Sequence, residues 1–215
     1  MRGPHGPGER HQPITGRVGW DDLYRGDDGE AIWSGRPNPA LVAEVSTLEP
    51  GKAVDLGCGE GGDAIWLASR GWDVTGIDIS SVAIERATRH ADRAGARVGW
   101  FRADFVEEPP PAGSFDLVTT HYPALLKTRA EQSLPALLSG VAPGGTLLFV
   151  THHLIDHEYA RSHGFEPDDY LGTNEVIEAL GDSWAIVVDE TRPRPSPSGS
   201  HPHAEDKVLR ARRLR

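Results

Sequence analysis

The stretch from Val54 to Ser80 constrains the fold of this chain more than any other. An apolar run ends at Asp55, a loop with four glycines and an apolar helix-like segment follow, and a second apolar run ends at Asp78. We expect strand, glycine loop, helix and strand, because glycine permits positive φ and lets backbone N–H groups approach a ligand closely. Such a unit holds a nucleoside-containing cofactor at the edge of a parallel sheet.

Composition excludes several classes of protein. A chain of 215 residues suits one sizeable domain. Its formal net charge of −10 argues against general nucleic-acid binding, although a local basic patch stays possible. The single cysteine, Cys58, excludes a disulfide framework, and no apolar run approaches the roughly 18 residues of a membrane span. The first residues also lack the apolar core of a secretory signal. We expect a cytoplasmic protein without membrane contacts.

The first 49 residues differ from the remainder. Residues 1–18 are rich in Gly, Pro and His, and we expect a disordered tail. Residues 19–215 are predicted to form a single domain, with residues 19–49 as an N-terminal lid and helix and residues 50–215 as the core. Asn38 followed by Pro39 predicts a helix start, because the side chain can cap and proline suits the first turn.

Strand and helix patterns alternate through the core. We expect strands at 52–56, 72–77, 97–102, 115–120, 146–150, 184–189 and 207–212, and helices at 62–70, 81–94, around 134–141 and at 173–180. The predicted inward positions are Ile65 and Ala68 on the first of these helices, and Ala83, Ala87, Ala91 and Ala94 on the second. The last two strands follow each other without a helix. The pattern predicts an α/β, mostly parallel sheet that ends in a hairpin-like pair.

Acidic residues surround the glycine loop. A dinucleotide site would place a pyrophosphate on the helix N-terminus. Here Glu60 and Asp63 flank that position, and negative charge disfavours a pyrophosphate. With Asp55 as a third carboxylate, the site suits a cationic ligand that carries an amine and a sulfonium. Asp78 can accept hydrogen bonds from both hydroxyls of a ribose. For Asp55 or Asp78 taken alone, the alternative to a ligand contact is a carboxylate that only caps a turn.

Five segments together resemble the motifs of class I S-adenosylmethionine-dependent methyltransferases. They are Val54-Asp55-Leu56-Gly57-Cys58-Gly59-Glu60-Gly61, Gly76-Ile77-Asp78-Ile79-Ser80, Ala103-Asp104-Phe105, Phe115-Asp116-Leu117-Val118 and Pro143-Gly144-Gly145-Thr146-Leu147-Leu148. The resemblance covers about residues 50–150. The lead-in segment from Trp33 to Asn38 and the compact size of the chain are similar to those of the tellurite-resistance and thiopurine methyltransferase branch of this family.

The resemblance implies a fold and a cofactor site. The fold is a three-layer, Rossmann-like, seven-stranded sheet of order 3-2-1-4-5-7-6 with strand 7 antiparallel. The cofactor is S-adenosylmethionine. The methionine part is assigned to Asp55, Gly57, Cys58, Gly59 and Gly61, the ribose to Asp78 with its neighbour Ile79, and the adenine to Asp104 and Phe105. For Cys58 we favour a small residue packed in a tight loop, since a nucleophile would need a nearby base.

The methyl acceptor is expected at the carboxyl edge of the sheet. Methyl transfer is an in-line displacement, so the protein supplies alignment and, for a protic acceptor, a base. Seven histidines fall in the segments expected as loops at this edge: His121, His152, His153, His157, His163, His201 and His203. We take His121 and His152 as candidate bases, with His121 also near the cofactor. Solvated loop histidines are the alternative.

A more specific hypothesis for the histidines is that several of them bind a metal ion. His153 and His157 have ligand spacing if their segment is helical. No further ligand pattern supports a metal, so none is predicted.

The N-terminal lead-in can fold over the same edge. Trp33 is interpreted as a lid wall and Arg36, or Asn38, as a contact to the cofactor's carboxylate. A core anchor is the alternative for Trp33.

Two other functions stay open. The first is an NAD(P)-dependent oxidoreductase, which Asp78 would suit but the acidic phosphate position would not. The second is a non-catalytic module that binds S-adenosylmethionine. No Asn-Pro-Pro-Tyr motif follows the fourth strand, which disfavours methylation of DNA amino groups. Acidic charge and small size favour a small-molecule acceptor, and the sequence leaves the oligomeric state open.

Overall fold

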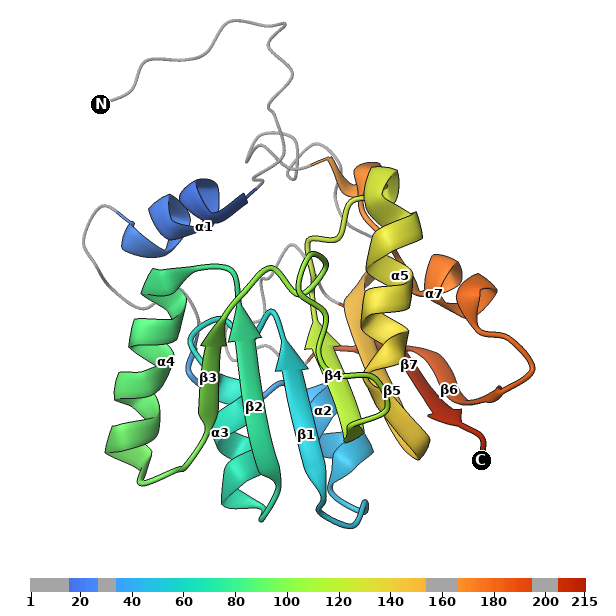
Figure 1. Ribbon diagram of the computed structural model, residues 1–215, viewed down its shortest axis with the longest axis horizontal. Coiled ribbons are helices and arrows are strands. Elements are labelled where there is room, and N and C mark those ends of the chain that lie inside the picture. The colour runs from blue at the N-terminus through green and yellow to red at the C-terminus, as the bar shows by residue number, and fades with distance from the viewer. Residues whose placement is uncertain (1–15, 27–33, 154–165, 195–204) are drawn as a thin grey trace, which may run out of the picture.

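Seven strands form one sheet in the part of the chain that the structure, a computed structural model, describes: residues 16–26, 34–153, 166–194 and 205–215. Their order is β3-β2-β1-β4-β5-β7-β6 (Figure 1). Neighbouring strands run parallel as far as β5, and β7 is antiparallel to both β5 and β6. The predicted order and the predicted antiparallel strand are confirmed.

The elements alternate as the sequence predicts. The strands are β1 (Lys52–Leu56), β2 (Asp73–Asp78), β3 (Gly99–Arg102), β4 (Phe115–His121), β5 (Val141–His153), β6 (Trp184–Pro193) and β7 (Glu205–Arg213). The helices are α1 (Gly16–Arg25), α2 (Pro39–Val45), α3 (Gly62–Ser69), α4 (Ser81–Ala94), α5 (Ala130–Ser139) and α7 (Thr173–Ala179), with 3-10 turns η1 (Lys127–Arg129) and η2 (Pro167–Asp169).

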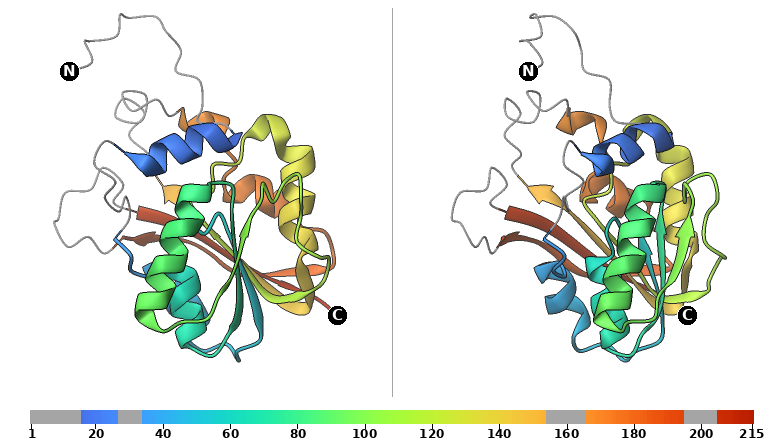
Figure 2. Two further views of the ribbon diagram at one scale, coloured as in Figure 1. Left: turned by 60° about the vertical axis from the view of Figure 1, so that its left-hand side comes forward. Right: turned by 90° about the vertical axis from the view of Figure 1, so that its left-hand side faces the viewer.

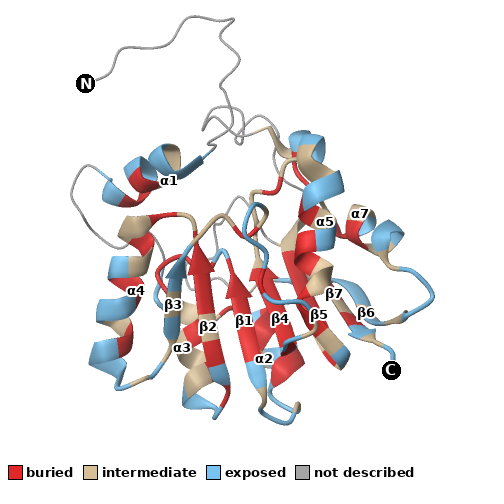
Figure 3. Ribbon diagram, viewed as in Figure 1, coloured by how far each residue is buried: buried red, intermediate tan, exposed pale blue. Residues whose placement is uncertain are grey.

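Helices cover both faces of the sheet (Figure 2). On one face, α2 and α3 bury Leu41 and Leu67 against strand residues such as Leu148. On the other face, α5 and α7 bury Leu137 and Val176 against the opposite side of the same strands. The central strands are therefore buried on both faces, as the near-continuous apolar run of β5 predicts (Figure 3).

Capping residues set the helix boundaries where the sequence places them. The Asn38 side chain accepts a hydrogen bond of 2.8 Å from the Ala40 N–H at the start of α2. At the start of α4, Ser80 Oγ accepts one from the Ala83 N–H. Gly95 ends α4 in the left-handed conformation, with φ of 65°.

The inward faces of two helices differ from the prediction. In α3, Ala64 and Leu67 are completely buried, whereas Ile65 and Ala68 are only partly buried. Five consecutive apolar residues in this helix leave its rotation undetermined by pattern alone. In α4 the alanine stripe is buried as predicted except at Ala94, which is exposed at the last helical turn.

The antiparallel part of the sheet is longer than its apolar runs. Val141, expected on a helix, begins β5, so the strand includes residues 141–145 before its predicted start. His152 and His153, expected in a loop, end β5 and pair with Asp206 and Glu205 of β7. Backbone hydrogen bonds continue the ladder whatever the side chains are, so apolar patterning underestimates its length.

The helix α1 begins at Gly16, four residues before the predicted start of order at Trp20, so residues 16–18 are not part of a disordered tail. Residues 1–15 lie outside the described residues. The helix lies at the carboxyl edge of the sheet, beside the start of α4 (Figure 1). There Asp21 accepts hydrogen bonds from Ser80 Oγ at 2.7 Å and from the Val82 N–H at 3.3 Å. A side chain from α1 therefore adds a second cap to α4.

Among the described helices, none has the length and apolar character needed to span a membrane.

Candidate functional site

The glycine loop connects the carboxyl end of β1 to the start of α3 and contacts the carboxyl end of β2. Gly57, Gly59 and Gly61 have φ values of 71°, 53° and 86°, which side chains rarely allow. The Gly59 N–H donates to Asp78 Oδ2 at 2.8 Å, and the Gly57 N–H donates to the Ile77 carbonyl at 2.8 Å. The loop is thus folded back onto the end of the second strand, as the strand–loop–helix–strand prediction requires.

Asp55 is a deeply buried acid of the site. Its Oδ2 has no hydrogen-bond partner among the described residues, while the carboxyl group accepts the Ala64 N–H at the start of α3. Burial, followed by the charges of Asp63 and Asp78, raises the pKa of Asp55 to about 8, although His121 acts in the opposite direction. A carboxyl group of this kind is largely protonated at neutral pH and is ready to ionise beside a cation.

Asp78 is held by backbone groups. Its Oδ1 accepts the Ser80 N–H at 2.8 Å and its Oδ2 accepts the Gly59 N–H. Burial raises the pKa of Asp78 in spite of these hydrogen bonds. Because a carboxylate has about four lone-pair sites, it can still accept hydrogen bonds from a ribose. Ile79, partly buried, lies between this acid and the capping serine.

The two acidic residues that flank the start of α3 each have a partner on another element. Glu60 Oε1 lies 2.7 Å from Arg86 Nη1 of α4, and both side chains are buried. Asp63 Oδ2 lies 2.9 Å from His121 Nδ1 of β4. Two of the three carboxylates therefore have partners that are distant in sequence, an arginine and a histidine, which the local pattern does not indicate.

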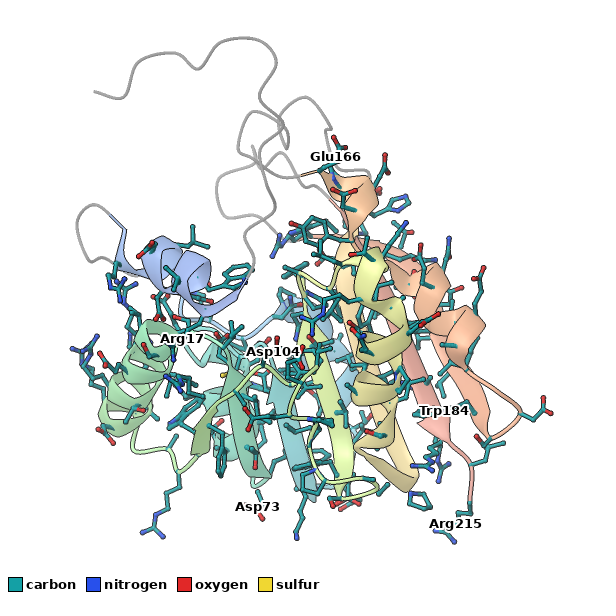
Figure 4. All side chains as sticks on the ribbon, turned by 45° about the horizontal axis from the view of Figure 1, so that its top comes forward. Arg17, Asp73, Asp104, Glu166, Trp184 and Arg215 are labelled. Atoms are coloured by element: carbon teal, nitrogen blue, oxygen red, sulfur yellow. The ribbon has the colours of Figure 1, made fainter. Side chains whose placement is uncertain are left out.

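Asp104 and Phe105 follow β3, where the adenine contacts are predicted. Asp104 Oδ1 accepts the Val106 N–H at 3.0 Å, and its Oδ2 lies 3.3 Å from Arg129 Nη1. Phe105 is buried in the core cluster beneath α5. Asp104 lies at the carboxyl edge of the sheet, and Asp73 at the opposite end of β2 (Figure 4).

Cys58 is buried in the glycine loop. Burial, with the charges of Asp78 and Asp55, raises the pKa of its thiol well above the ordinary value. A protonated, buried thiol is a poor nucleophile, which agrees with the interpretation of Cys58 as a packing residue.

The two candidate bases end neighbouring strands. His121 is the last residue of β4 and His152 is near the end of β5. Between them lies Tyr122, whose ring stacks on His152 with centroids 4.1 Å apart. The Arg194 guanidinium lies over the Tyr122 ring, 4.5 Å from its centroid. The histidines are therefore parts of a packed polar cluster and are not solvated loop residues.

The lead-in segment contributes two hydrogen bonds through Asn38, which the sequence indicated only as a possible cofactor contact. The Asn38 N–H donates to Asp63 Oδ1 at 2.5 Å, and Asn38 Nδ2 donates to the Tyr122 hydroxyl at 2.8 Å. The Arg36 side chain is exposed, and its carbonyl packs against Gly62. Trp33, His157, His163, His201 and His203 lie outside the described residues, so the expectations for them stay predictions.

No group of three or more potential metal ligands occurs within residues 16–26, 34–153, 166–194 and 205–215. Two surface cavities of about 450 and 440 Å³ lie beside α4, and neither is lined by Asp55 or Asp78.

Comparison with known proteins identifies the family. The sequence pattern of a methyltransferase domain matches residues 53–145. "Probable thiol methyltransferase 2" of Arabidopsis thaliana is 33% identical over 180 residues, which cover 80% of this chain and 76% of that protein. The chain belongs to the methyltransferase family. The resemblance read from the five sequence motifs is thereby confirmed.

Other relatives match over a smaller share of their length. The chain spans 33%, 44% and 32% of a ribosomal RNA small subunit methyltransferase C from Alcanivorax borkumensis, a trans-aconitate 2-methyltransferase from Streptomyces avermitilis and a probable tocopherol O-methyltransferase from rice. Their acceptors differ in chemistry, so the shared region identifies the family and not the acceptor.

Solved structures agree on the fold. A protein that takes part in converting a disulfide bond into a thioacetal group during echinomycin biosynthesis is 26% identical, with a TM-score of 0.71 and 91% of each chain covered. The N-methyltransferase NodS of Bradyrhizobium japonicum, in complex with S-adenosyl-L-homocysteine, is 22% identical, with a TM-score of 0.63, covering 82% of this chain and 84% of NodS. Both likenesses confirm the Rossmann-like architecture.

Proposed function

We propose that this chain transfers a methyl group from S-adenosylmethionine to the sulfur atom of a small-molecule acceptor. The observation that carries the proposal is the similarity to a thiol methyltransferase over most of both chains. The likeness to a protein of disulfide-to-thioacetal conversion, over 91% of each chain, also favours sulfur chemistry.

The site supports a cationic, nucleoside-containing cofactor. Asp55 offers a buried oxygen without a partner in the described part of the chain, and a cation beside it would favour its ionised form. Asp78 retains lone pairs for ribose hydroxyls, and the glycine loop leaves its backbone close to both acids. Asp55, Gly57, Cys58, Gly59, Gly61, Asp78, Ile79, Asp104 and Phe105 remain the proposed cofactor positions, with His121, Arg36 and Trp33 at the lid side.

The reaction needs little from the protein beyond alignment. The acceptor sulfur forms a bond to the methyl carbon while the bond from that carbon to the sulfonium breaks, and the electron pair goes to the departing sulfur. The products are a methyl thioether and S-adenosylhomocysteine. A thiol must lose its proton, which makes a base useful below the thiol pKa.

Binding and transfer separate the proposed function from its alternatives. Calorimetry with S-adenosylmethionine and with NADH tests the cofactor, and NADH binding without S-adenosylmethionine binding would refute the proposal. A radiolabelled-methyl assay then compares alkyl and aryl thiols, trans-aconitate, a phenol and ribosomal RNA. Transfer to thiols supports the proposal, transfer only to another class overturns the acceptor, and cofactor binding without any transfer indicates a non-catalytic module.

The partner and the compartment are inferred from composition. A net charge of −10 favours a small molecule over RNA. Because the single cysteine is buried and the proposed acceptor is a thiol, we place the activity in the reducing cytoplasm.

A further inference from the structure

One face of the sheet changes from apolar to polar towards the carboxyl edge. On the side covered by α2 and α3, Ala53 and Leu117 belong to the apolar core cluster. Two residues further along each strand, the same face carries Asp55 and Thr119, which are neighbours in register. His121 continues this face at the end of β4. Polar side chains from two adjacent strands are therefore buried together under the start of α3.

His121 is paired within this group. Its Nδ1 lies 2.9 Å from Asp63 Oδ2, and the side chains of His121 and Asp63 are only 6% and 15% exposed. Asp63 is in the first turn of α3, where backbone N–H groups favour a carboxylate. Its other oxygen accepts the Asn38 N–H. Asp63 is thus held from two sides and faces one nitrogen of the imidazole.

The other imidazole nitrogen has no such contact. Nε2 of His121 is buried and has no hydrogen-bond partner among the described residues, whereas Nδ1 has Asp63 Oδ2 at 2.9 Å, although the angle there departs from that of a regular hydrogen bond. Like Nε2, Asp55 Oδ2 and Thr119 Oγ1 are buried without a hydrogen-bond partner in the described part of the chain. Buried polar atoms without partners are uncommon in folded proteins, and several on one face point to a ligand that supplies the missing hydrogen bonds.

We propose that Asp63 is a positioning residue that orients His121 so that Nε2 takes the proton of the methyl acceptor. The proposal rests on the proposed function and names the group that serves it. Nδ1 keeps its hydrogen for Asp63, which leaves the Nε2 lone pair as the proton acceptor. As the acceptor sulfur attacks the methyl carbon, its proton moves to Nε2, the carbon–sulfonium bond breaks, and the positive charge passes from the sulfonium to the imidazolium. His121 afterwards releases the proton to solvent.

The surrounding charges act on this base. Burial alone would lower the pKa of His121, but Asp63, Asp55 and Asp206 together raise it. His152 and Arg194 contact the adjacent Tyr122 from the β5 and β6 sides. The base is active in its neutral form, so the rate is expected to rise with pH through a pKa above the ordinary histidine value.

Asn38 connects the lead-in segment to this pair. Its backbone N–H contacts Asp63 and its side chain contacts the Tyr122 hydroxyl, next to His121. Since Nε2 is closed off from water, an acceptor reaches it only after a local displacement, which these two hydrogen bonds would resist. The lead-in segment thereby couples entry of the acceptor to the orientation of the base.

Kinetics with two thiols test the proposal. An alkyl thiol, with a pKa near the cysteine value of about 8.5, needs a base at pH 7, whereas an acidic aryl thiol is already ionised. We expect His121→Gln to lower kcat/KM at least about 100-fold for the alkyl thiol and less than about tenfold for the aryl thiol. Asp63→Asn should lower the alkyl-thiol rate by about tenfold or more and move the acid limb of the pH profile to lower pH. Asp73→Asn, at the opposite end of β2, should change neither.

Imidazole NMR tests the pair without any acceptor. In the wild-type protein, the His121 ring is expected to titrate above the ordinary value of about 6.5 with the hydrogen on Nδ1, and Asp63→Asn should lower this pKa. An unchanged His121 titration in Asp63→Asn, or equal losses for both thiols in His121→Gln, overturns the proposal. If the wild-type protein binds S-adenosylmethionine but methylates neither thiol, the proposed function fails. The change of the His121 titration in Asp63→Asn then tests by itself whether Asp63 orients His121.

Discussion

Replacing Asp55 with asparagine tests whether the ligand-free protein keeps a protonated carboxyl group at the end of β1. The pKa of Asp55 is raised from 3.8 to about 8, chiefly by burial. Each pH unit corresponds to about 1.4 kcal/mol, so the full difference is roughly 6 kcal/mol. Because Asp63 and His121 can redistribute protons with Asp55, we expect about 2 kcal/mol of it to be measurable as pH-dependent stability.

The sign follows from proton binding. Between about pH 4 and pH 8 the folded protein holds a proton on Asp55 that the unfolded chain has released. Raising the pH across this window therefore lowers the free energy of unfolding of the wild-type protein. Asparagine resembles the protonated carboxyl group and keeps an oxygen for the Ala64 N–H, so the variant lacks this loss.

The assay is urea unfolding without ligand at pH 5 and pH 9, for the wild type, Asp55→Asn and the exposed control Asp73→Asn. The stability of Asp55→Asn relative to wild type should rise by about 2 kcal/mol between the two pH values, while the control follows the wild type. An identical pH dependence of wild type and Asp55→Asn would refute the reasoning, because the folded protein would then contain an ionised Asp55.

Ligand binding gives a second measurement of the same group. S-adenosylmethionine should release close to one proton from the wild type at pH 7, measured by calorimetry in two buffers of different ionisation enthalpy. Asp55→Asn should release none and should bind more weakly. Stability and affinity would then change in opposite directions at one residue.

Three further substitutions test the packing around the cofactor loop. Glu60→Gln removes the charge that faces the buried Arg86 guanidinium at 2.7 Å and should cost about 3 kcal/mol in chemical denaturation. Gly76→Ala places a Cβ in steric conflict with the Trp100 ring and should lower stability by about 1–3 kcal/mol in thermal unfolding. Asp21→Ala removes the second cap of α4, should cost about 1 kcal/mol, and should speed proteolysis within α1.

Two of these substitutions, Gly76→Ala and Asp21→Ala, have a specific comparison. Gly99→Ala, where a Cβ would meet no neighbouring atom closer than 3.6 Å, should be tolerated far better than Gly76→Ala. Replacing the Trp100 ring with the smaller leucine side chain should recover part of the stability lost in Gly76→Ala. If Gly76→Ala costs the same stability in the wild type and in Trp100→Leu, the cause is not steric. For Asp21→Ala, an unchanged cleavage rate in α1 would show that this contact does not hold the helix.

Local patterns predicted the cofactor half of the fold well. The strand–glycine–helix–strand unit and the Asn38 cap depend on residues close in sequence, and the structure has them where expected. The helix predicted at 81–94 has these bounds, between Ser80 and Gly95. The predicted inward face of α3 was wrong because its apolar residues are consecutive and do not indicate which side faces the sheet. The predicted length of β5 was too short because its last residues pair with β7 through backbone hydrogen bonds.

The pairings of the site could not be predicted from the chain alone. Asp63 and His121 are far apart in sequence and meet because β4 lies beside β1 in the sheet. Glu60 meets Arg86 because α3 and α4 lie on the same face. The signal for the first pair was present as a histidine at the end of β4, but its partner is identified only by strand order.

The position of Tyr122 has a consequence for how this enzyme family can diversify. Its backbone is left-handed, with φ of 53°, a conformation that costs a non-glycine residue about 1–2 kcal/mol. Contacts from Asn38, His152 and Arg194, in three separate segments, hold it there. None of the three belongs to the unit from β1 to β3 that carries the glycine loop. Substitutions of His152 and Arg194 can therefore alter the proposed acceptor side without touching the proposed cofactor positions between β1 and β3, which would allow the acceptor to change while the proposed donor site is kept.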